Sequence, residues 1–209
     1  MGDNLFLQFV QQLINGISLG SIYALIALGY TMVYGIMKLI NFAHGDVYMV
    51  GAYVGFFAAT TANLPFFPSI ILAMLATGLG GVIIERLAYK PLRHHPKIAI
   101  LTTAIGVSLF LEYTTMLLLT PQPRTFPPLL PNAIYHIGGL IISFQQIVIL
   151  AVSVILMILL TYVVNHTKMG KAMRAVSYDP DAAQLMGINV DKTISFTFFV
   201  GSSLAGAAG

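Results

Sequence analysis

The sequence predicts an all-α, polytopic membrane protein with about six transmembrane helices, and two observations carry this prediction. Hydrophobic residues make up 57% of the 209-residue chain and charged residues only 8%, whereas a soluble domain carries roughly 25% charged residues. Prolines also divide the chain into apolar runs of about the 20 residues that a helix needs to cross a bilayer. These runs do not alternate like the strands of a membrane β-barrel, and in lipid a helix satisfies its own backbone hydrogen bonds. The runs are residues 13–37, 42–62, 69–88, 98–120, 141–165 and 193–209.

The segments before and between the apolar runs support the predicted boundaries of the spans. The start, MGDNLFLQFVQQ, lacks the Lys or Arg of a cleavable signal peptide, so we expect the first span to be retained, with residues 4–12 extending it or lying at the interface. A short loop that contains proline, residues 63–68, separates the second span from the third. A long Pro-rich loop, residues 121–137, separates the fourth span from the fifth. The sixth run ends without a polar flank, from which we expect that the chain is truncated. Residues 1–209 are predicted to form a single transmembrane domain.

Basic residues indicate the orientation of the spans. Two loops hold eight of the ten Lys and Arg residues, while the Pro-rich loop between them holds only Arg124. Because Lys and Arg concentrate in cytoplasmic loops, we place the two basic loops inside, the Pro-rich loop outside and the N-terminus outside. This pattern also accounts for the net charge of +3 without a nucleic-acid partner. The basic residues are Arg86, Lys90, Arg93 and Lys97 in one loop, and Lys168, Lys171, Arg174 and Lys192 in the other.

Small residues recur at helical spacing within the spans. They include Gly16-x-x-x-Gly20, Gly51-x-x-x-Gly55 and the series Gly201, Ala205 and Gly209. Such faces let helices approach closely in lipid. Packing within one subunit is the plainer interpretation, and an interface between subunits is the alternative.

The second basic loop, residues 166–192, carries the signals of a short capped helix. An aspartate at the N-cap is followed by proline at the first helical position and by a further aspartate at the positive helix end. Helix-forming alanines come next, and a glycine suits the stop. A rigid cytoplasmic helix between spans could seat in a groove of a soluble partner, although a plain capped surface helix has the same signals. The residues concerned are Asp179, Asp181, Ala182, Ala183 and Gly187.

Two separate motifs resemble one family of transporters. The pattern Asp181-Ala182-Ala183-x-x-x-Gly187 resembles the EAA-x-x-x-G loop of ABC importer permeases, with Asp in place of Glu and without the Ile-x-Leu-Pro that often follows. The segment NGISLGSIYALIALGYTMVYGIMKLINFAHGDVYMVGAY is similar to the opening of branched-chain amino acid permeases of the LivH type. The blocks INFAHGD, residues 40–46, and RAVSYDPDAAQLMGINVDK, residues 174–192, both fit that family.

The resemblance implies the channel-forming permease subunit of an ABC importer for branched-chain, hydrophobic amino acids, a multi-pass protein of the bacterial inner (plasma) membrane. Its partners would be a second, related permease subunit, two ATPase subunits and a periplasmic substrate-binding protein. Alternating access would be driven by ATPase subunits that dock on the helix at 179–187, within the cytoplasmic coupling loop 166–192. The chain has no G-x-x-x-x-G-K-[ST] loop, so ATP would be used by the partner subunits and this chain is expected to hold no cofactor.

Polar residues at membrane depth are costly and are therefore candidates for the substrate path. Glu112 in the fourth span is expected to face the bundle interior, where it could also serve only as an interhelical hydrogen-bond partner. Asn41 and His44 lie in a turn where a broken helix could expose backbone groups to a substrate, with Asn41 or Asp46 capping the next helix. The plainer interpretation of this cluster is a turn at the cytoplasmic surface. His44 has no second His or Cys at a spacing suited to a metal.

Some features of the sequence bear on other functions. The chain contains no cysteine, nucleophile–base pair or carboxylate dyad, so we expect neither a metal site nor an enzyme. A urea or amide permease of the same family shares much of the pattern. An ion-coupled secondary transporter, with Glu112 as the coupling residue, is the alternative from another class.

Overall fold

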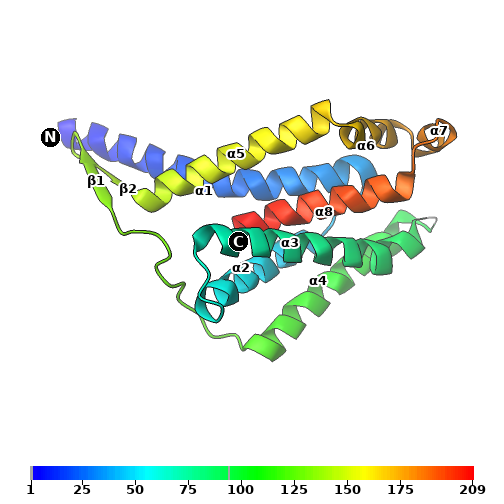
Figure 1. Cartoon of the computed structure of the whole chain (residues 1–209), viewed down its shortest axis with the longest axis horizontal. Helices are drawn as coiled ribbons and strands as arrows, with labels where there is room; N and C mark the ends of the chain where they lie inside the picture. Colours follow the sequence, from blue (N-terminus) through cyan, green and yellow to red (C-terminus); the bar gives the residue numbers. More distant parts are fainter. Residues whose placement is uncertain (1, 94) are drawn as a thin grey trace.

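Eight α-helices and one β-hairpin make up most of the part of the chain that the computed structural model describes, residues 2–93 and 95–209 (Figure 1). This architecture confirms the predicted all-α fold class. The helices are α1 (Gly2–Met37), α2 (His44–Thr60), α3 (Phe66–Ile84), α4 (Lys97–Leu119), α5 (Phe144–His166), α6 (Lys168–Tyr178), α7 (Pro180–Leu185) and α8 (Val190–Ala208). A π-helical turn, Glu85–Tyr89, and a 3-10 turn, Lys90–Leu92, continue α3 toward α4, and strands β1 (Ile134–Ile137) and β2 (Leu140–Ser143) pair antiparallel.

Helix α8 is the centre of the bundle. It packs against α1, α2 and α3, while α5 lies on α1 and α4 diverges from the other helices (Figure 1). Glycines allow the close crossings, because a Cβ added to Gly51 of α2 would lie 2.6 Å from Cα of Gly206, and one added to Gly201 would lie 2.8 Å from the carbonyl oxygen of Gly29. Two of the small-residue faces predicted from the sequence, those of Gly51 and Gly201, are therefore used for packing inside the subunit.

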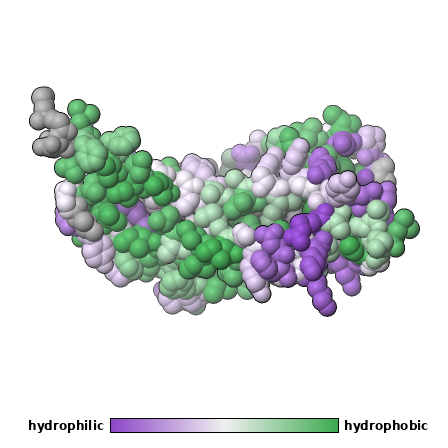
Figure 2. All heavy atoms as spheres, turned by 90° about the horizontal axis from the view of Figure 1, so that it is seen from above, coloured by the Kyte–Doolittle hydropathy of each residue, from purple (hydrophilic) through white to green (hydrophobic). Residues whose placement is uncertain are grey.

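Apolar side chains hold the short helices α6 and α7 to the end of the bundle. Val176 is fully buried and Met173 nearly so, and both belong to one cluster with Ile36 of α1 and Phe198 of α8. Tyr89 of the π-helical turn joins the same cluster and packs its ring on Phe198 at 5.6 Å. The basic loops predicted to be cytoplasmic thus share one core, and hydrophilic atoms gather at this end of the molecule (Figure 2).

Four helical segments, rather than about six, are long and apolar enough to cross a membrane within the described part of the chain: Leu5–Met37, Phe66–Leu92, Lys97–Leu119 and Phe144–His166. They establish a multi-pass membrane protein. The runs at 42–62 and 193–209 are helical but fall short of this criterion. Helix α2 has only 17 residues. Helix α8 carries Asp191 and Lys192 in its first turn. It also carries several Ser and Thr residues, most of which are buried against neighbouring helices.

Several boundaries differ from the predicted ones. Residues 4–12 extend the first helix, so that α1 has 36 residues. The fifth run was predicted from residue 141, but α5 begins at Phe144 because the side chains of Ser143 and Gln146 form a capping box there. The residues just before it form β2, the second strand of a hairpin that was not predicted from the sequence.

Candidate functional site

The short helix α7 is built by local signals. The Asp179 carboxylate caps it, since Oδ1 accepts hydrogen bonds from the backbone N–H groups of Asp181 at 2.9 Å and of Ala182 at 3.0 Å. At the other end Gly187 has a φ of 84°, a conformation that favours glycine, and Ile188 N–H donates to the carbonyl of Ala183 at 3.0 Å. Hydrogen bonds and backbone conformation thereby define both ends of this six-residue helix.

The surface of α7 combines a buried anchor with an exposed apolar tip. Ala183 is only 5% exposed and belongs to the apolar cluster shared with α6 and α8, whereas the other four predicted coupling residues are exposed. Tyr178 at the end of α6, Leu185 at the end of α7 and Met186 just after it are 94%, 90% and 83% exposed, and we refer to these three residues as the apolar tip. These three residues were not among the predicted coupling residues, although large apolar residues in an otherwise polar loop are a signal that the sequence contains. An exposed apolar patch beside polar groups is typical of a protein-binding surface.

A chain of charged groups ties the start of α8 to the end of α3. Asp191, in the first turn of α8, pairs with Lys90 Nζ at 2.7 Å and with Arg93 Nη1 at 2.6 Å. Arg93 also pairs with Glu85, which is fully buried and accepts a second hydrogen bond from the Ser195 hydroxyl at 2.6 Å. The charges are compensated, as a buried ion must be. We refer to Glu85, Lys90, Arg93 and Asp191 as the ion network.

The ion network was not predicted, although the sequence contains all four of its residues. Glu85 stands inside the third predicted span, and Arg93 and Lys90 were interpreted only as orientation signals. A carboxylate at the end of an apolar run indicates a buried partner, but the partner on α8 lies far along the sequence. The pKa of the Asp191 carboxyl is lowered, chiefly by the hydrogen bond from Lys90. Burial opposes this effect, and the charges of Arg93 and Lys90 lower the pKa further.

Asn41 and His44 are both buried near the start of α2. The Tyr89 hydroxyl donates to Asn41 Oδ1 at 2.7 Å, and His44 Nε2 lies 3.2 Å from the carbonyl oxygen of Ile26 on α1. His44 is 3% exposed, and its Nδ1 has no hydrogen-bond partner among the described residues. The expectation that Asn41 or Asp46 caps α2 is wrong, because no side chain caps this helix and Asp46 instead accepts a hydrogen bond from Ser108 of α4.

Glu112 is exposed on α4 within this chain, whereas Asn41 and His44 are buried. The sequence had predicted that it faces the bundle interior. It does not, because α4 touches the rest of the molecule chiefly through its other end, where Ile100 and Ala104 are its two buried residues. Of the three predicted substrate-path residues, two are buried near the start of α2 and the third is exposed.

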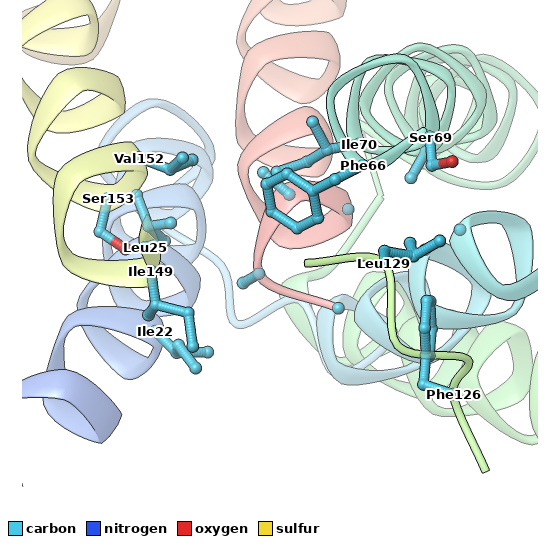
Figure 3. A pocket seen from close by; sticks show the side chains of 17 residues that line it. Ile22, Leu25, Phe66, Ser69, Ile70, Phe126, Leu129, Ile149, Val152 and Ser153 are labelled. Atoms are coloured by element: carbon cyan, nitrogen blue, oxygen red, sulfur yellow. The ribbon is translucent and has the colours of Figure 1, made fainter. Parts of the chain in front are cut away.

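An apolar cavity of about 290 Å³ lies among α1, α2, α3, α5 and the end of α8 (Figure 3). Aliphatic and aromatic side chains dominate its lining, among them Ile22, Phe66 and Phe126. Its polar side chains are two serines, Ser69 and Ser153, and none of the lining residues is charged. Such a cavity suits an aliphatic group. Within the described residues no group of three or more His, Cys, Asp or Glu side chains could hold a metal ion.

Comparisons with known proteins agree on one family. A family model described as "Branched-chain amino acid transport system / permease component" matches residues 12–209. The chain is 42% identical to the high-affinity branched-chain amino acid transport system permease protein BraD of Pseudomonas aeruginosa, over 96% of this chain and 69% of that protein. It is 39% identical to the corresponding protein LivH of Escherichia coli K12, over 98% of this chain and 70% of the relative.

An archaeal protein is similar as well. The probable branched-chain amino acid transport permease protein LivH of Methanocaldococcus jannaschii is 30% identical, over 90% of this chain and 61% of its own length. No solved structure matches the chain.

Proposed function

This chain belongs to the family of branched-chain amino acid transport permease components, and we propose that it is the channel-forming permease subunit of an ABC importer for branched-chain, hydrophobic amino acids. It works in the bacterial inner membrane by alternating access. Separate ATPase subunits drive the cycle and use the ATP, so that this chain itself needs no cofactor. A second, related permease subunit and a periplasmic substrate-binding protein complete the transporter.

The observation that carries this proposal is the helix α7 with its apolar tip. A docking element must be rigid and must present a surface that water does not satisfy. The capped helix meets the first condition, since Asp179 and Gly187 fix its ends. Tyr178, Leu185 and Met186 meet the second because they are almost fully exposed. We infer that the tip inserts into an apolar groove of an ATPase subunit, with Asp181 and Ala182 at the edge of the contact.

The ion network supports a path from this docking surface into the membrane. Only a short linker separates α7 from Asp191, which Lys90 and Arg93 hold to the end of α3. Helix α8 then runs through the centre of the bundle, and its last residues line the apolar cavity. A displacement of α7 by an ATPase subunit is therefore passed along α8 toward the cavity, while Ala183 keeps α7 seated on the apolar cluster.

The apolar cavity supports the substrate class. Its uncharged lining suits the side chain of leucine, isoleucine or valine, whereas urea or a small amide would lose hydrogen bonds to water there without replacing them. The ammonium and carboxylate groups of an amino acid need polar partners elsewhere along the path. Asn41, His44 and Glu112 remain our candidates for that role, and Asn41 and His44 are the better placed because they are buried beside the start of α2.

Cysteine cross-linking tests the proposal, because the chain contains no native cysteine. Leu185→Cys and the matched control Ala183→Cys are each co-expressed with the ATPase subunits, which carry single cysteines along their membrane-facing groove. We expect a disulfide from position 185, which is 90% exposed, but not from position 183, which is 5% exposed, and we expect ATP to change its yield.

Uptake measurements decide between an ABC importer and an ion-coupled secondary transporter. Vanadate traps ABC ATPases, so we expect it to stop the uptake of leucine into membrane vesicles that have the same orientation as the cell. An ionophore should not stop this uptake. Uptake that survives vanadate but collapses with the ion gradient, together with no cross-link from position 185 in a transport-competent preparation, would overturn the proposed function.

A further inference from the structure

We propose that the irregular segment of residues 120–133, which we refer to as the strap, is a movable lid on the apolar cavity, and that Phe126 is the side chain that closes it. The strap is the Pro-rich part of the chain between α4 and β1. The closure concerns this chain alone, whereas the entry of an amino acid side chain beneath the strap rests on the proposed function.

The strap forms part of the wall of the cavity. Phe126 and Leu129 line the cavity together with residues of α1, α2, α3, α5 and the end of α8, so they are the two lining residues that come from a loop between helices. In Figure 3 both lie on the side of α2 and α3, opposite the side chains from α1 and α5. Leu25 and Ser153 line the same cavity and are each only 2% exposed. Water therefore has little access to this part of the cavity when the strap is in place.

The backbone of the strap is not tied to the rest of the molecule. Within the described part of the chain, no backbone–backbone hydrogen bond involves residues 121–132. Five prolines contribute no N–H donor and restrict φ, which favours a stiff, extended segment. Such a segment can move as one piece when a few side-chain contacts break, because no helix or strand has to be undone. The prolines are Pro121, Pro123, Pro127, Pro128 and Pro131.

Arg124 and Phe126 fasten the strap to the end of α2 through their side chains. The guanidinium carbon of Arg124 lies 5.7 Å from the ring centroid of Phe56 and 5.5 Å from that of Phe57. Its Nη2 also donates to the carbonyl oxygen of Leu119 at 2.8 Å. The ring of Phe126 packs edge to face on Phe56, with 5.8 Å between the centroids. Cation–π and aromatic contacts at an exposed site are individually weak, which suits a fastening that opens and closes.

Gly55 gives the ring of Phe126 its place on α2. A Cβ added to Gly55 would lie 3.7 Å from Cζ of Phe126, so any side chain longer than that of alanine would take the place of the ring. Gly55 itself lines the cavity. The ring thus closes a gap beside the helix backbone, and its departure would open the cavity there.

The two ends of the strap differ in how firmly they are held. Ala133 is fixed at the base of the hairpin, where its carbonyl oxygen accepts a hydrogen bond from the N–H of Phe144 at 2.9 Å. The hairpin is fixed in turn, because the Gln11 side chain bonds both backbone groups of Ile141 at 2.8 Å. Thr120, at the other end, has a φ of 61° and a ψ of 150°, a strained conformation for a residue other than glycine. Strain at a joint lowers the cost of rotating it, so we expect the strap to bend away at Thr120.

Thiol labelling tests the closure, since the chain contains no native cysteine. Ser153→Cys places one thiol in the cavity, and a membrane-impermeant methanethiosulfonate is added to the full transporter in vesicles with the same orientation as the cell. We expect labelling to be slow, and to become about tenfold faster when Phe126→Ala or Arg124→Gln is added, because either change shifts the population toward the open strap. Phe67→Ala is the control, since Phe67 is exposed near the start of α3 and does not line the cavity.

Two further comparisons show whether the strap itself controls the labelling. Arg124→Lys keeps a positive charge near the two phenylalanine rings and should restore most of the protection. Equal labelling rates with and without Phe126→Ala, in chains that assemble normally, would overturn the inference. The same acceleration by Phe67→Ala would also overturn it, because a general loosening of the bundle would then explain the result.

An excess of leucine separates this inference from the proposed function. In the chain with Phe126→Ala, leucine should slow the labelling of position 153 by occupying the cavity. Glycine has no side chain to place there and should not slow it. Labelling that depends on the strap but not on leucine would support the lid and contradict the cavity as the site of the substrate side chain. Labelling that depends on neither would overturn the lid, whereas the cross-link from position 185 tests the docking of the ATPase independently.

Discussion

Asp191 connects two parts of the chain that the proposed mechanism must keep together. It is half exposed, yet it holds Lys90 and Arg93 at 2.7 and 2.6 Å, and Arg93 in turn compensates the buried Glu85. Removing Arg93 would leave the fully buried Glu85 without its ion-pair partner, which is the costly way to break a buried pair. Asp191 is thus the member of the ion network that can be altered without leaving a buried charge behind.

The lowered pKa of Asp191 predicts how stability depends on pH. A carboxyl whose pKa is lower in the folded state stabilises that state above its unfolded pKa of about 3.9, and this contribution is lost as the pH falls through the lower, folded value. We expect Asp191→Asn to lower the melting temperature of the detergent-solubilised protein at neutral pH. The difference from the unaltered protein should shrink as the pH falls below about 4.

Melting curves between neutral and acidic pH check this prediction. Asp181→Asn is the control, since Asp181 is exposed and makes no ion pair among the described residues. A difference for Asp191→Asn that is the same at every pH would mean that the ion pairs contribute nothing and that the loss has another cause.

Glu112 provides a second test at the same scale. Because its side chain is exposed on α4, whereas Asn41 and His44 are buried, we expect Glu112→Gln to keep most of the leucine uptake and all of its vanadate sensitivity. Glu112→Leu, which has a similar size but no polar group, separates a hydrogen-bonding role from a packing role. Complete loss of uptake in a normally assembled Glu112→Gln transporter would favour ion coupling instead.

At the scale of elements, α7 was predictable because its signals are local. Asp179, Pro180 and Gly187 act within a few residues of one another, and each occupies the position that its chemistry favours. The ion network and the orientation of Glu112 were not predictable in this way. Glu85 finds Arg93 and Ser195 only after α3 and α8 pack, and the exposure of Glu112 depends on how little of α4 touches the bundle. Composition identifies a span but does not say which side of it faces a neighbour.

The cap of α7 can be tested as an element. Asp179→Ala removes the acceptor for two backbone N–H groups, which typically costs about 1 kcal/mol, a large share of the stability of a six-residue helix. We expect faster hydrogen exchange at residues 181–186, a weaker cross-link from position 185 and less transport for each ATP hydrolysed. Asp179→Ser, which keeps a capping oxygen, should restore all three. Unchanged exchange in Asp179→Ala would show that tertiary packing alone holds the helix.

At the scale of the whole molecule, the apolar cavity and the docking helix lie at opposite ends of α8. We expect Val152→Phe, which fills the cavity from α5, to lower leucine uptake more than it lowers the uptake of alanine, because the larger side chain loses more room. Position 185 should still cross-link to the ATPase in this variant. Ile155→Phe, on the exposed side of the same helix, is the control, and equal losses for leucine and alanine would argue against the cavity as a side-chain site.

The central position of α8 has a consequence for the surrounding membrane. The long helices around it, α1 with 36 residues above all, expose large apolar side chains on their outer sides, and at 1.5 Å per residue α1 reaches about 54 Å, well beyond a hydrocarbon layer of about 30 Å. Such helices adapt to a thinner or thicker bilayer by tilting. Helix α8 is enclosed by protein for most of its length and has no acyl chains to match. Changes in lipid chain length should therefore alter the tilt of the outer helices while the distance between the docking helix and the cavity stays nearly constant, which would let one transporter work in membranes whose thickness varies with growth temperature.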